Sequence, residues 1–333
     1  MIKFRNCKVV GKGIDPDAYH RQTAERGAPD FAVSPSVLKA FLPGECAERW
    51  KDGYTQPESS AKDWGNLMDT LLTDENAFPN KYHVLPETYP APADHDKVKK
   101  GTLKAGDPLR WNSNAGYCKD WVKRNGSGRE AVSADDYHAA SAAWTRLMRN
   151  QYAVQLMTVS DRQVMVVGEA EVAGVIIPVR CLIDFKPSCD SRYWSSLADL
   201  KTTKNAAARS FRRWAFDAGY DIQAAFDLDL FNAATDEERD TWCLIIQENI
   251  PPFQVTPRMM SQQFIGLGRT RYVRALELYA ECLKSGVWPG YEANEQTIDG
   301  WAVLEPEPWM TLPEAFATPQ PAPPPEEPSE MPS

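Results

Sequence analysis

The stretch from Val164 to Thr203 constrains the fold of this 333-residue chain more than any other. It is rich in β-branched residues, and the Ala173-Gly174 pair within it is typical of the turn of a β-hairpin. We expect a third strand around Asp199 and Lys201. Residues two apart in a strand point to the same side, so these two side chains should project together while Leu200 points away.

Asp184 follows an apolar run, residues 179–183, and should lie at the end of a neighbouring strand. Two carboxylates that converge from adjacent strands, with a lysine beside them, form the arrangement that a hard divalent cation and a phosphate group require. The stretch therefore predicts a site for both.

The composition of the chain is compatible with a site for a cation and a phosphate, and it narrows the possible classes of protein. A 43% hydrophobic content is ample for one large domain or two small ones. No apolar run approaches the roughly 20 residues of a membrane span, and the first residues are too polar for a signal peptide, so we expect a soluble, cytoplasmic protein. The seven cysteines are scattered with no CxxC pair, which indicates reduced thiols rather than a zinc or disulfide framework.

The net charge of −9 argues against a surface coated with positive charge for nucleic acid, but a local basic groove is compatible with it. One candidate is a lysine cluster in the loop-rich region of residues 78–127, which could contact a DNA backbone or could simply be solvated surface. The other is a basic helix that leaves the candidate metal site after Thr202. The residues of these two groups are Lys97, Lys99, Lys100 and Lys104, and then Lys204, Arg209, Arg212 and Arg213.

Apolar residues at three- and four-residue spacing predict the other helices. They are expected at residues 34–43, beginning at Ser34-Pro35, and at 61–72, 133–157, 220–231 and 269–284, with a strand at 242–248. Asp69 lies at the edge of the buried stripe of the second helix, where it is either a solvated flank or a paired or metal-bound carboxylate. Gln223 and Asp227 should share one face of the fourth. The sequence Gly266-Leu267-Gly268 is interpreted as a turn.

The domain boundaries follow from these patterns. Residues 1–30 lack periodicity and are interpreted as an N-terminal extension, and residues 31–317 form the main domain. Residues 318–333 are rich in proline and glutamate, bury almost nothing and are expected to be disordered.

Six blocks in order resemble a known family. They are SPSVLKAFL, WGNLMDTLL, VRCLIDFKP, DLKTT, YDIQAAFDLD and CLIIQEN. Their succession is similar to the RecE-type, or exodeoxyribonuclease VIII-like, branch of the PD-(D/E)XK nuclease superfamily. The resemblance implies an α/β fold with a central mixed β-sheet flanked by helices. It also implies Mg²⁺-dependent digestion of linear double-stranded DNA from the 5′ end, which leaves a 3′ single strand for an annealing protein, in a bacterial or phage-infected cell. Ring-shaped homo-oligomers are a further implication.

The resemblance assigns roles position by position. Asp184 matches the family's first strand acid, Asp199 and Lys201 match the (D/E)xK element, and Gln223 matches the glutamine of the Q-helix motif. Mg²⁺, or Mn²⁺ in its place, would be held by Asp184, Asp199, Asp69 and the backbone carbonyl of Leu200. Lys201 would orient the attacking water, and Gln223 would position the substrate or the lysine.

Two positions depart from the family pattern. Asp69 stands where a histidine is usual, and Asp227 stands where a tyrosine is common. Asp69 can still bind a hard cation, but Asp227 should repel phosphate unless it pairs with a residue such as Arg213.

Three alternatives compete with this assignment. Asp184-Phe185-Lys186 is itself a DxK sequence, with Glu169 or Glu171 as the preceding acid. A second alternative is a nuclease-fold protein that binds DNA ends or a recombination partner without hydrolysis. The third is an α/β protein whose acids are only structural.

Overall fold

The computed structural model describes residues 2–54, 60–73, 77–291, 297–299 and 301–303. The chain divides into two compact units, Met1–Gly290 and Tyr291–Ser333. In the second unit, β11 (Thr297–Ile298) pairs antiparallel with β12 (Trp301–Ala302). The tail predicted for residues 318–333 lies outside the described residues.

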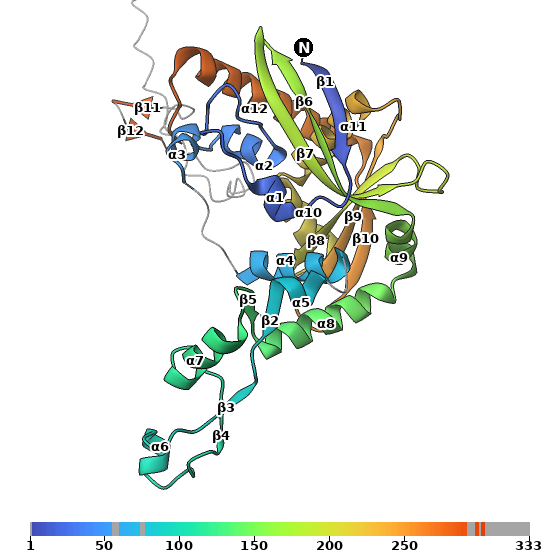
Figure 1. Cartoon of the computed structure of the whole chain (residues 1–333). Helices are drawn as coiled ribbons and strands as arrows, with labels where there is room; N and C mark the ends of the chain where they lie inside the picture. Colours follow the sequence, from blue (N-terminus) through green and yellow to red (C-terminus); the bar gives the residue numbers. More distant parts are fainter. Residues whose placement is uncertain (1, 55–59, 74–76, 292–296, 300, 304–333) are drawn as a thin grey trace, which may run out of the picture. The chain divides into compact units, whose positions relative to one another are not determined.

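The first unit contains the elements that matter for function (Figure 1). Its strands are β1 (Lys3–Gly11), β2 (Tyr82–Val84), β3 (Thr88–Pro90), β4 (Pro108–Arg110), β5 (Glu130–Val132), β6 (Ser160–Val172), β7 (Val175–Pro187), β8 (Ser196–Thr203), β9 (Thr241–Glu248) and β10 (Val255–Met259). Its helices are α1 (Pro16–His20), α2 (Pro35–Leu38), the 3₁₀ turn η1 (Lys39–Phe41), α3 (Ala47–Lys51), α4 (Ser60–Thr73), α5 (Ala77–Lys81), α6 (Asp96–Lys99), α7 (Gly116–Asn125), α8 (Ala134–Met148), α9 (Gln151–Thr158), α10 (Ala208–Asp217), α11 (Tyr220–Ala234) and α12 (Gln262–Ser285).

A mixed sheet forms the centre of this unit. Within the described residues it has six strands in the order β1-β6-β7-β8-β9-β10. The β8–β9 pair is parallel and the other neighbouring pairs are antiparallel. The predicted fold class, a central mixed sheet flanked by helices, is therefore confirmed.

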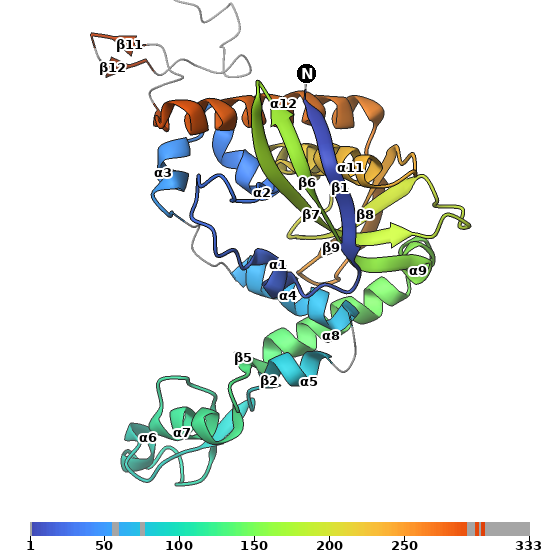
Figure 2. The same ribbon diagram turned by 45° about the horizontal axis from the view of Figure 1, so that its top comes forward.

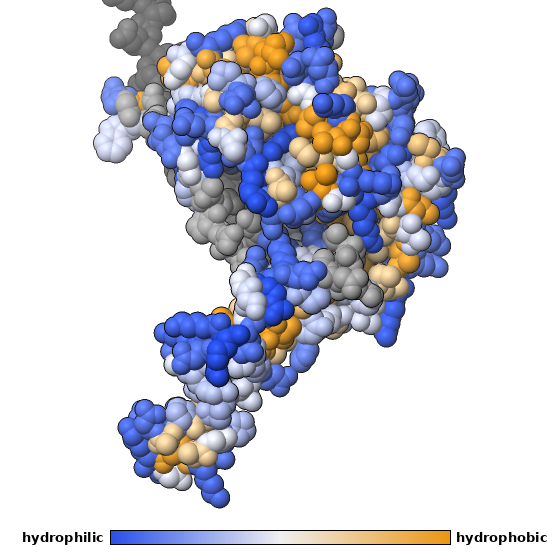
Figure 3. All heavy atoms as spheres, viewed as in Figure 1, coloured by the Kyte–Doolittle hydropathy of each residue, from blue (hydrophilic) through white to orange (hydrophobic). Residues whose placement is uncertain are grey.

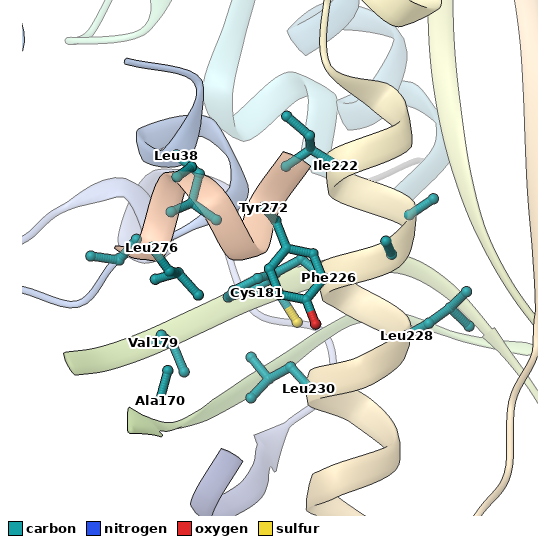
Figure 4. Close-up of a cluster of buried hydrophobic side chains, with 14 of the residues drawn as sticks. Leu38, Ala170, Val179, Cys181, Ile222, Phe226, Leu228, Leu230, Tyr272 and Leu276 are labelled. Atoms are coloured by element: carbon teal, nitrogen blue, oxygen red, sulfur yellow. The ribbon is translucent and has the colours of Figure 1, made fainter. Parts of the chain in front are cut away.

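Helices cover both faces of the sheet. On one face α2, α11 and α12 pack over alternate residues of the central strands, and Figure 4 shows side chains such as Val179, Phe226 and Tyr272 meeting there. On the other face α8 and α9 pack against a smaller group that includes Phe185, Leu200 and Ile245. Burial on both faces explains why these strands carry nearly continuous apolar runs.

The predicted hairpin is present as β6 and β7, and its turn lies at Ala173 and Gly174, which both have positive φ. Residues 3–11, expected to lie in an N-terminal extension, instead form β1 at the edge of the sheet, paired with β6. Their side chains are mostly exposed, which explains why they show no apolar periodicity.

Three helix predictions need correction. The helix expected over residues 34–43 is a short α-helix, α2, that continues as the 3₁₀ turn η1. The single helix expected over residues 133–157 is split, because the Asn150 side chain accepts a hydrogen bond from the Ala153 N–H and begins α9. The turn expected at Gly266-Leu267-Gly268 lies inside α12. A Cβ atom on Gly268 would come within 1.9 Å of the Asp221 carbonyl oxygen, so this glycine permits close packing of α12 on α11.

An arm formed by β3, β4, α6 and α7 projects away from the sheet in both ribbon views (Figures 1 and 2). On the face drawn in Figure 3, hydrophilic residues surround a smaller hydrophobic group on this arm. No helix in the described part of the chain combines the length and apolar character needed to cross a membrane.

Candidate active site

The site is built where β7 and β8 separate. Their only paired residues among those described are Phe185 and Ala198. Beyond that pair the Asp184 side chain takes the place of the backbone ladder, and its Oδ2 accepts a hydrogen bond from the Leu200 N–H at 3.0 Å. Asp184 therefore lies inside β7, three residues before its last residue, rather than at its end as expected.

The predicted alternation along β8 is confirmed. Asp199 and Lys201 lie on the same side of the strand and form an ion pair. Leu200 points to the opposite face, where it packs with Phe185 and Ile245. The N–H and C=O of one strand residue point to the same edge, so the Leu200 carbonyl also faces the gap beside Asp184.

A cavity of about 300 Å³ opens at this gap. Its walls come from segments that are far apart in sequence, including α1, α2, η1, α4, β6, β7, β8 and α11. Its polar lining comprises Tyr19, His20, Ser34, Ser36, Lys39, Asp69, Gln163, Asp184, Asp199, Lys201, Tyr220, Gln223 and Asp227. The structure thus brings together every predicted catalytic and carboxylate residue.

Four carboxyl groups share this cavity and affect one another's ionisation. Burial raises the pKa of Asp184 well above its usual value, and the Asp199 charge and a hydrogen bond with Asp199 add to the rise. Burial raises the pKa of Asp69 to about 6, with Asp199 again adding to it. Burial also raises the pKa of Asp227 well above its ordinary value. Crowded buried acids of this kind retain protons unless a cation replaces them.

Two lysines supply the positive charge. Burial alone would lower the pKa of Lys201, but the adjacent Asp199 carboxylate outweighs it and raises that pKa. The Lys201 Nζ lies 4.8 Å from the centre of the Tyr220 ring. The Lys39 Nζ lies 5.7 Å from the centre of the same ring. Burial, helped by repulsion from Lys201, lowers the pKa of Lys39 to about 8.

The donor set fits a hard divalent cation chemically. Asp184 and Asp199 both line the cavity, and the Leu200 N–H that bonds to Asp184 places the Leu200 carbonyl at the same gap. Carboxylate and carbonyl oxygens are the ligands that Mg²⁺ prefers. In the described ranges, however, no three His, Cys, Asp or Glu side chains are close enough to form a ready metal cluster. The inclusion of Asp69 as a third ligand therefore stays a prediction.

The two residues that depart from the expected family pattern, Asp69 and Asp227, both line the cavity. Asp69 lies on α4 and lines the cavity. Asp227 is 1% exposed and hydrogen-bonds with Gln223 one turn earlier on α11 and with Cys181. Arg213, the suggested partner of Asp227, instead lies on the surface 3.9 Å from Asp217. The raised pKa favours the neutral form of Asp227, which weakens its repulsion toward phosphate.

The rival DxK sequence is not brought together. Lys186 does not line the cavity and forms an ion pair with Glu237 at 3.2 Å. Of its two candidate partners, Glu169 accepts a hydrogen bond from Asn6, and Glu171 pairs with Arg5. The geometry favours the assignment with Asp199 and Lys201.

The predicted DNA-contacting residues are all exposed, but they form two separate groups. Lys97, Lys99, Lys100 and Lys104 lie on α6 and the loop after it, at the far end of the arm. Lys204 precedes α10, which carries Arg209, Arg212 and Arg213. The two groups lie apart in both ribbon views (Figures 1 and 2).

Sequence reasoning missed Gln163, Lys39 and Tyr220 as cavity residues. Lys39 reaches the cavity because the Val33 backbone is hydrogen-bonded to β7. This pairing holds the start of α2 against that strand. Gly219, with φ +68°, lets the Lys39 alkyl chain pass within about 3 Å of where a Cβ would lie. The one available signal was the lysine in SPSVLK, the block whose serine and proline already predicted a helix start.

Comparison with known proteins supports the fold. The model of a family described as a PDDEXK-like domain of unknown function (DUF3799) matches residues 34–298. A protein from Eubacterium rectale, whose description provisionally calls it an exonuclease, has a solved structure that is 14% identical with a TM-score of 0.52. That alignment covers 90% of this chain and 98% of the other.

A second solved structure shares only part of the architecture. It is a phage-related exonuclease from Haemophilus somnus 129PT, 13% identical, with a TM-score of 0.24 and coverage of 59% of this chain and 91% of that one. A likeness of this size is too weak to support an inference about fold or function. No curated protein matches the chain.

Proposed function

The chain belongs to the PDDEXK-like domain family, and from that premise we propose that it is a metal-dependent DNA nuclease of the RecE type. The proposed reaction is Mg²⁺-dependent hydrolysis of linear double-stranded DNA from its 5′ end, with Mn²⁺ able to substitute. The product would be a 3′ single strand for an annealing protein.

One observation carries this proposal. At the point where β7 and β8 separate, the carboxyl groups of Asp184 and Asp199 line one cavity, and Asp199 is paired with Lys201. Carboxylates gathered in one cavity repel one another, which raises the free-energy cost of ionising them. A divalent cation removes that cost, and the adjacent ammonium group suits an anionic substrate.

Each residue has a definite task in this scheme. Asp184 and Asp199, with the Leu200 carbonyl, would hold the cation, which when bound supplies neutralisation of phosphate charge and a water of lowered pKa. The Lys201 ammonium is held in place by Asp199 and aims its charge at the developing negative charge of the phosphate. Gln223 bonds to Asp227 and lines the same cavity, where it can position substrate.

The exposed cations suit a DNA substrate. Arginines on α10 follow directly after the strand that carries Lys201, so a phosphate backbone bound by Arg209, Arg212 and Arg213 would run close to the cavity. The lysines of α6 would contact duplex DNA further away. A homo-oligomeric ring around DNA is part of the same proposal and rests on the family resemblance alone.

The competing function is binding of DNA ends without hydrolysis. The acids at positions 69 and 227 are the reason to consider it. Burial favours the neutral form of Asp227 and so weakens one of these two reasons. Asp69, with a pKa near 6, is still able to join a cation as an oxygen ligand.

The test uses linear duplex DNA labelled separately at its 5′ and 3′ ends, incubated with Mg²⁺ or Mn²⁺. The proposal predicts early release of the 5′ label as short products while the 3′ label stays in long single strands. Early loss of the 3′ label would contradict the polarity. Binding of the duplex with no loss of either label in both metals would establish the non-catalytic function instead.

A further inference from the structure

Gln163 occupies an irregular position in the middle of the β6–β7 hairpin. Arg162 pairs with Phe185 and Val164 pairs with Ile183, so the register is the same on both sides of Gln163. Gln163 itself lies directly opposite Asp184 but is not paired with it, and its φ is +48°. This is the left-handed region, which residues other than glycine rarely adopt. The backbone is held there partly because the Gln163 carbonyl accepts a hydrogen bond from the Ile14 N–H.

The Gln163 side chain lies in the candidate site. The residue is 4% exposed and lines the cavity. Its Nε2 donates to Asp184 Oδ1 at 3.5 Å, while Leu200 N–H donates to the other oxygen, Oδ2. Hydrogen bonds of this length are common at catalytic sites before metal and substrate bind, and they tighten afterwards.

The Gln163 Oε1 has no hydrogen-bond partner and is buried. A buried amide oxygen without a partner costs free energy, as does a left-handed backbone at a residue with a side chain. Both costs fall on one residue, and the first is offset if the cavity receives a group that donates to this oxygen or is bound by it.

We propose that Gln163 is a positioning residue of this site: its amide nitrogen fixes the orientation of Asp184, and its free amide oxygen binds a divalent cation or a water held by that cation. The proposal rests on the nuclease function above, because that function places a cation beside Asp184. It goes beyond that function by adding to the cation site a residue that neither the sequence pattern nor the family resemblance assigns.

Gln247 provides a matched control elsewhere in the sheet. It is also a fully buried glutamine with an unpartnered Oε1. Its Nε2 donates to the carbonyl of Phe253 at 2.9 Å, and the residue does not line the cavity. Gln247 therefore has the burial and the unpaired oxygen of Gln163 without access to the site.

The experiment is calorimetric titration of Mn²⁺ into the metal-free full-length protein, without DNA. Gln163→Gly removes the side chain and suits the backbone conformation, and Gln163→Met fills the same volume without an amide. We expect both to weaken Mn²⁺ affinity by about 10- to 100-fold, the usual effect of losing a group that orients metal ligands. Gln163→Gly should nevertheless keep or raise the thermal midpoint of wild type, because glycine relieves the strain at φ +48°. Gln247→Ala should lower the midpoint and leave Mn²⁺ affinity unchanged.

Each outcome decides something. Wild-type Mn²⁺ affinity in both Gln163 variants would overturn the inference while leaving the nuclease proposal intact. Wild-type affinity in Gln163→Met alone would assign the effect to volume and would also overturn it. Absence of Mn²⁺ binding by the wild-type protein would remove the cation site and the inference with it. If both variants weaken Mn²⁺ binding but the wild-type protein does not degrade DNA, the inference is supported and only the nuclease activity is contradicted.

Discussion

Two buried aspartates on helix α11 lie in opposite kinds of surroundings. Asp221 is fully buried, and both of its carboxylate oxygens accept hydrogen bonds from the Arg271 Nη1 at 2.8 Å. Asp227, further along the same helix, is 1% exposed, has an unpartnered Oδ1, and shares its cavity with three other acids. The first carboxylate is paired within the fold, whereas the second belongs to a group with fewer cations than acids.

The difference separates a carboxylate that is neutralised by a partner within the fold from a group of acids with too few cations around them. The attraction within a fully hydrogen-bonded buried ion pair offsets the cost of removing both charges from water. Removing one partner leaves an uncompensated buried charge. A crowd of acids can be neutralised only by protons or by an added cation. The carboxyl groups of the candidate site thus differ from Asp221 in their incomplete pairing rather than in their burial, and substitutions at both kinds of position can test that distinction.

The largest effect is expected from losing the charges of the site. Lys201→Ala and Asp199→Ala should each reduce metal-dependent hydrolysis of linear duplex DNA by at least about 1,000-fold, equivalent to roughly 4 kcal/mol of barrier, because both remove stabilisation of the reacting phosphate. Circular dichroism should show an intact fold. Lys186→Ala is the control, and it should retain near-wild-type rates because Lys186 pairs with Glu237 outside the cavity. Equal losses in the Lys186 and Lys201 variants would support the rival DxK assignment.

The next effect concerns the structural pair. Arg271→Ala leaves the Asp221 carboxylate buried without its partner and should lower the free energy of unfolding by roughly 3–5 kcal/mol. The rate of DNA hydrolysis per folded molecule should be unchanged. Urea denaturation measures the first quantity. Arg274→Ala, an exposed position on the same helix, should change stability by less than about 0.5 kcal/mol. A small effect of Arg271→Ala would mean that Asp221 is not held by this pair.

Substitution of Asp69 should raise the free energy of unfolding, whereas Arg271→Ala should lower it. Its pKa rises from an ordinary value of 3.8 to about 6 on folding, so the protonated form is favoured in the native state. Its contribution to stability is complete below pH 4 and is lost as the pH rises through about 6. Asp69→Asn should therefore stabilise the metal-free protein at pH 8 by up to about 3 kcal/mol, and the gain should vanish near pH 4. Denaturation at the two pH values, with a metal chelator present, tests this. A loss of stability at pH 8 would contradict it.

The smallest effect is expected at Asp227. Because burial favours the neutral form of this carboxyl, Asp227→Asn replaces that form with an uncharged group of similar shape and should change stability at pH 7 by less than about 1 kcal/mol. Asp221→Asn, which breaks a charged pair, should cost clearly more. Equal costs for the two substitutions would remove the contrast between these aspartates.

The sequence predicted the part of this site that depends on local periodicity. Residues two apart in a strand place Asp199 and Lys201 together, and residues one helical turn apart place Gln223 and Asp227 together. The apolar run before Asp184 placed that acid on a neighbouring strand, and the family resemblance added its role and the departures at positions 69 and 227.

Contacts between distant segments determine the features that the sequence could not predict. Gln163 faces Asp184 because β6 and β7 pair in one particular register, and neither that register nor the positive φ at this position can be read from the sequence. Lys39 reaches the cavity because Val33 is bonded to β7. Gly268 resembled a turn residue in sequence, and its real requirement, close approach to the Asp221 backbone, appears only when α12 packs on α11.

If the site binds metal as proposed, the carboxyl groups of Asp184 and Asp199 exchange protons for a divalent cation. Titration of Mn²⁺ into the metal-free protein, in two buffers of different ionisation enthalpy at pH 7, measures this exchange for wild type and Asp184→Asn. We predict saturable binding by the wild type with release of protons, since burial and Asp199 raise the pKa of Asp184 well above its usual value. Asp184→Asn should lose both the affinity and the proton release. Saturable binding that releases no protons and is unchanged in Asp184→Asn would contradict the proposed exchange.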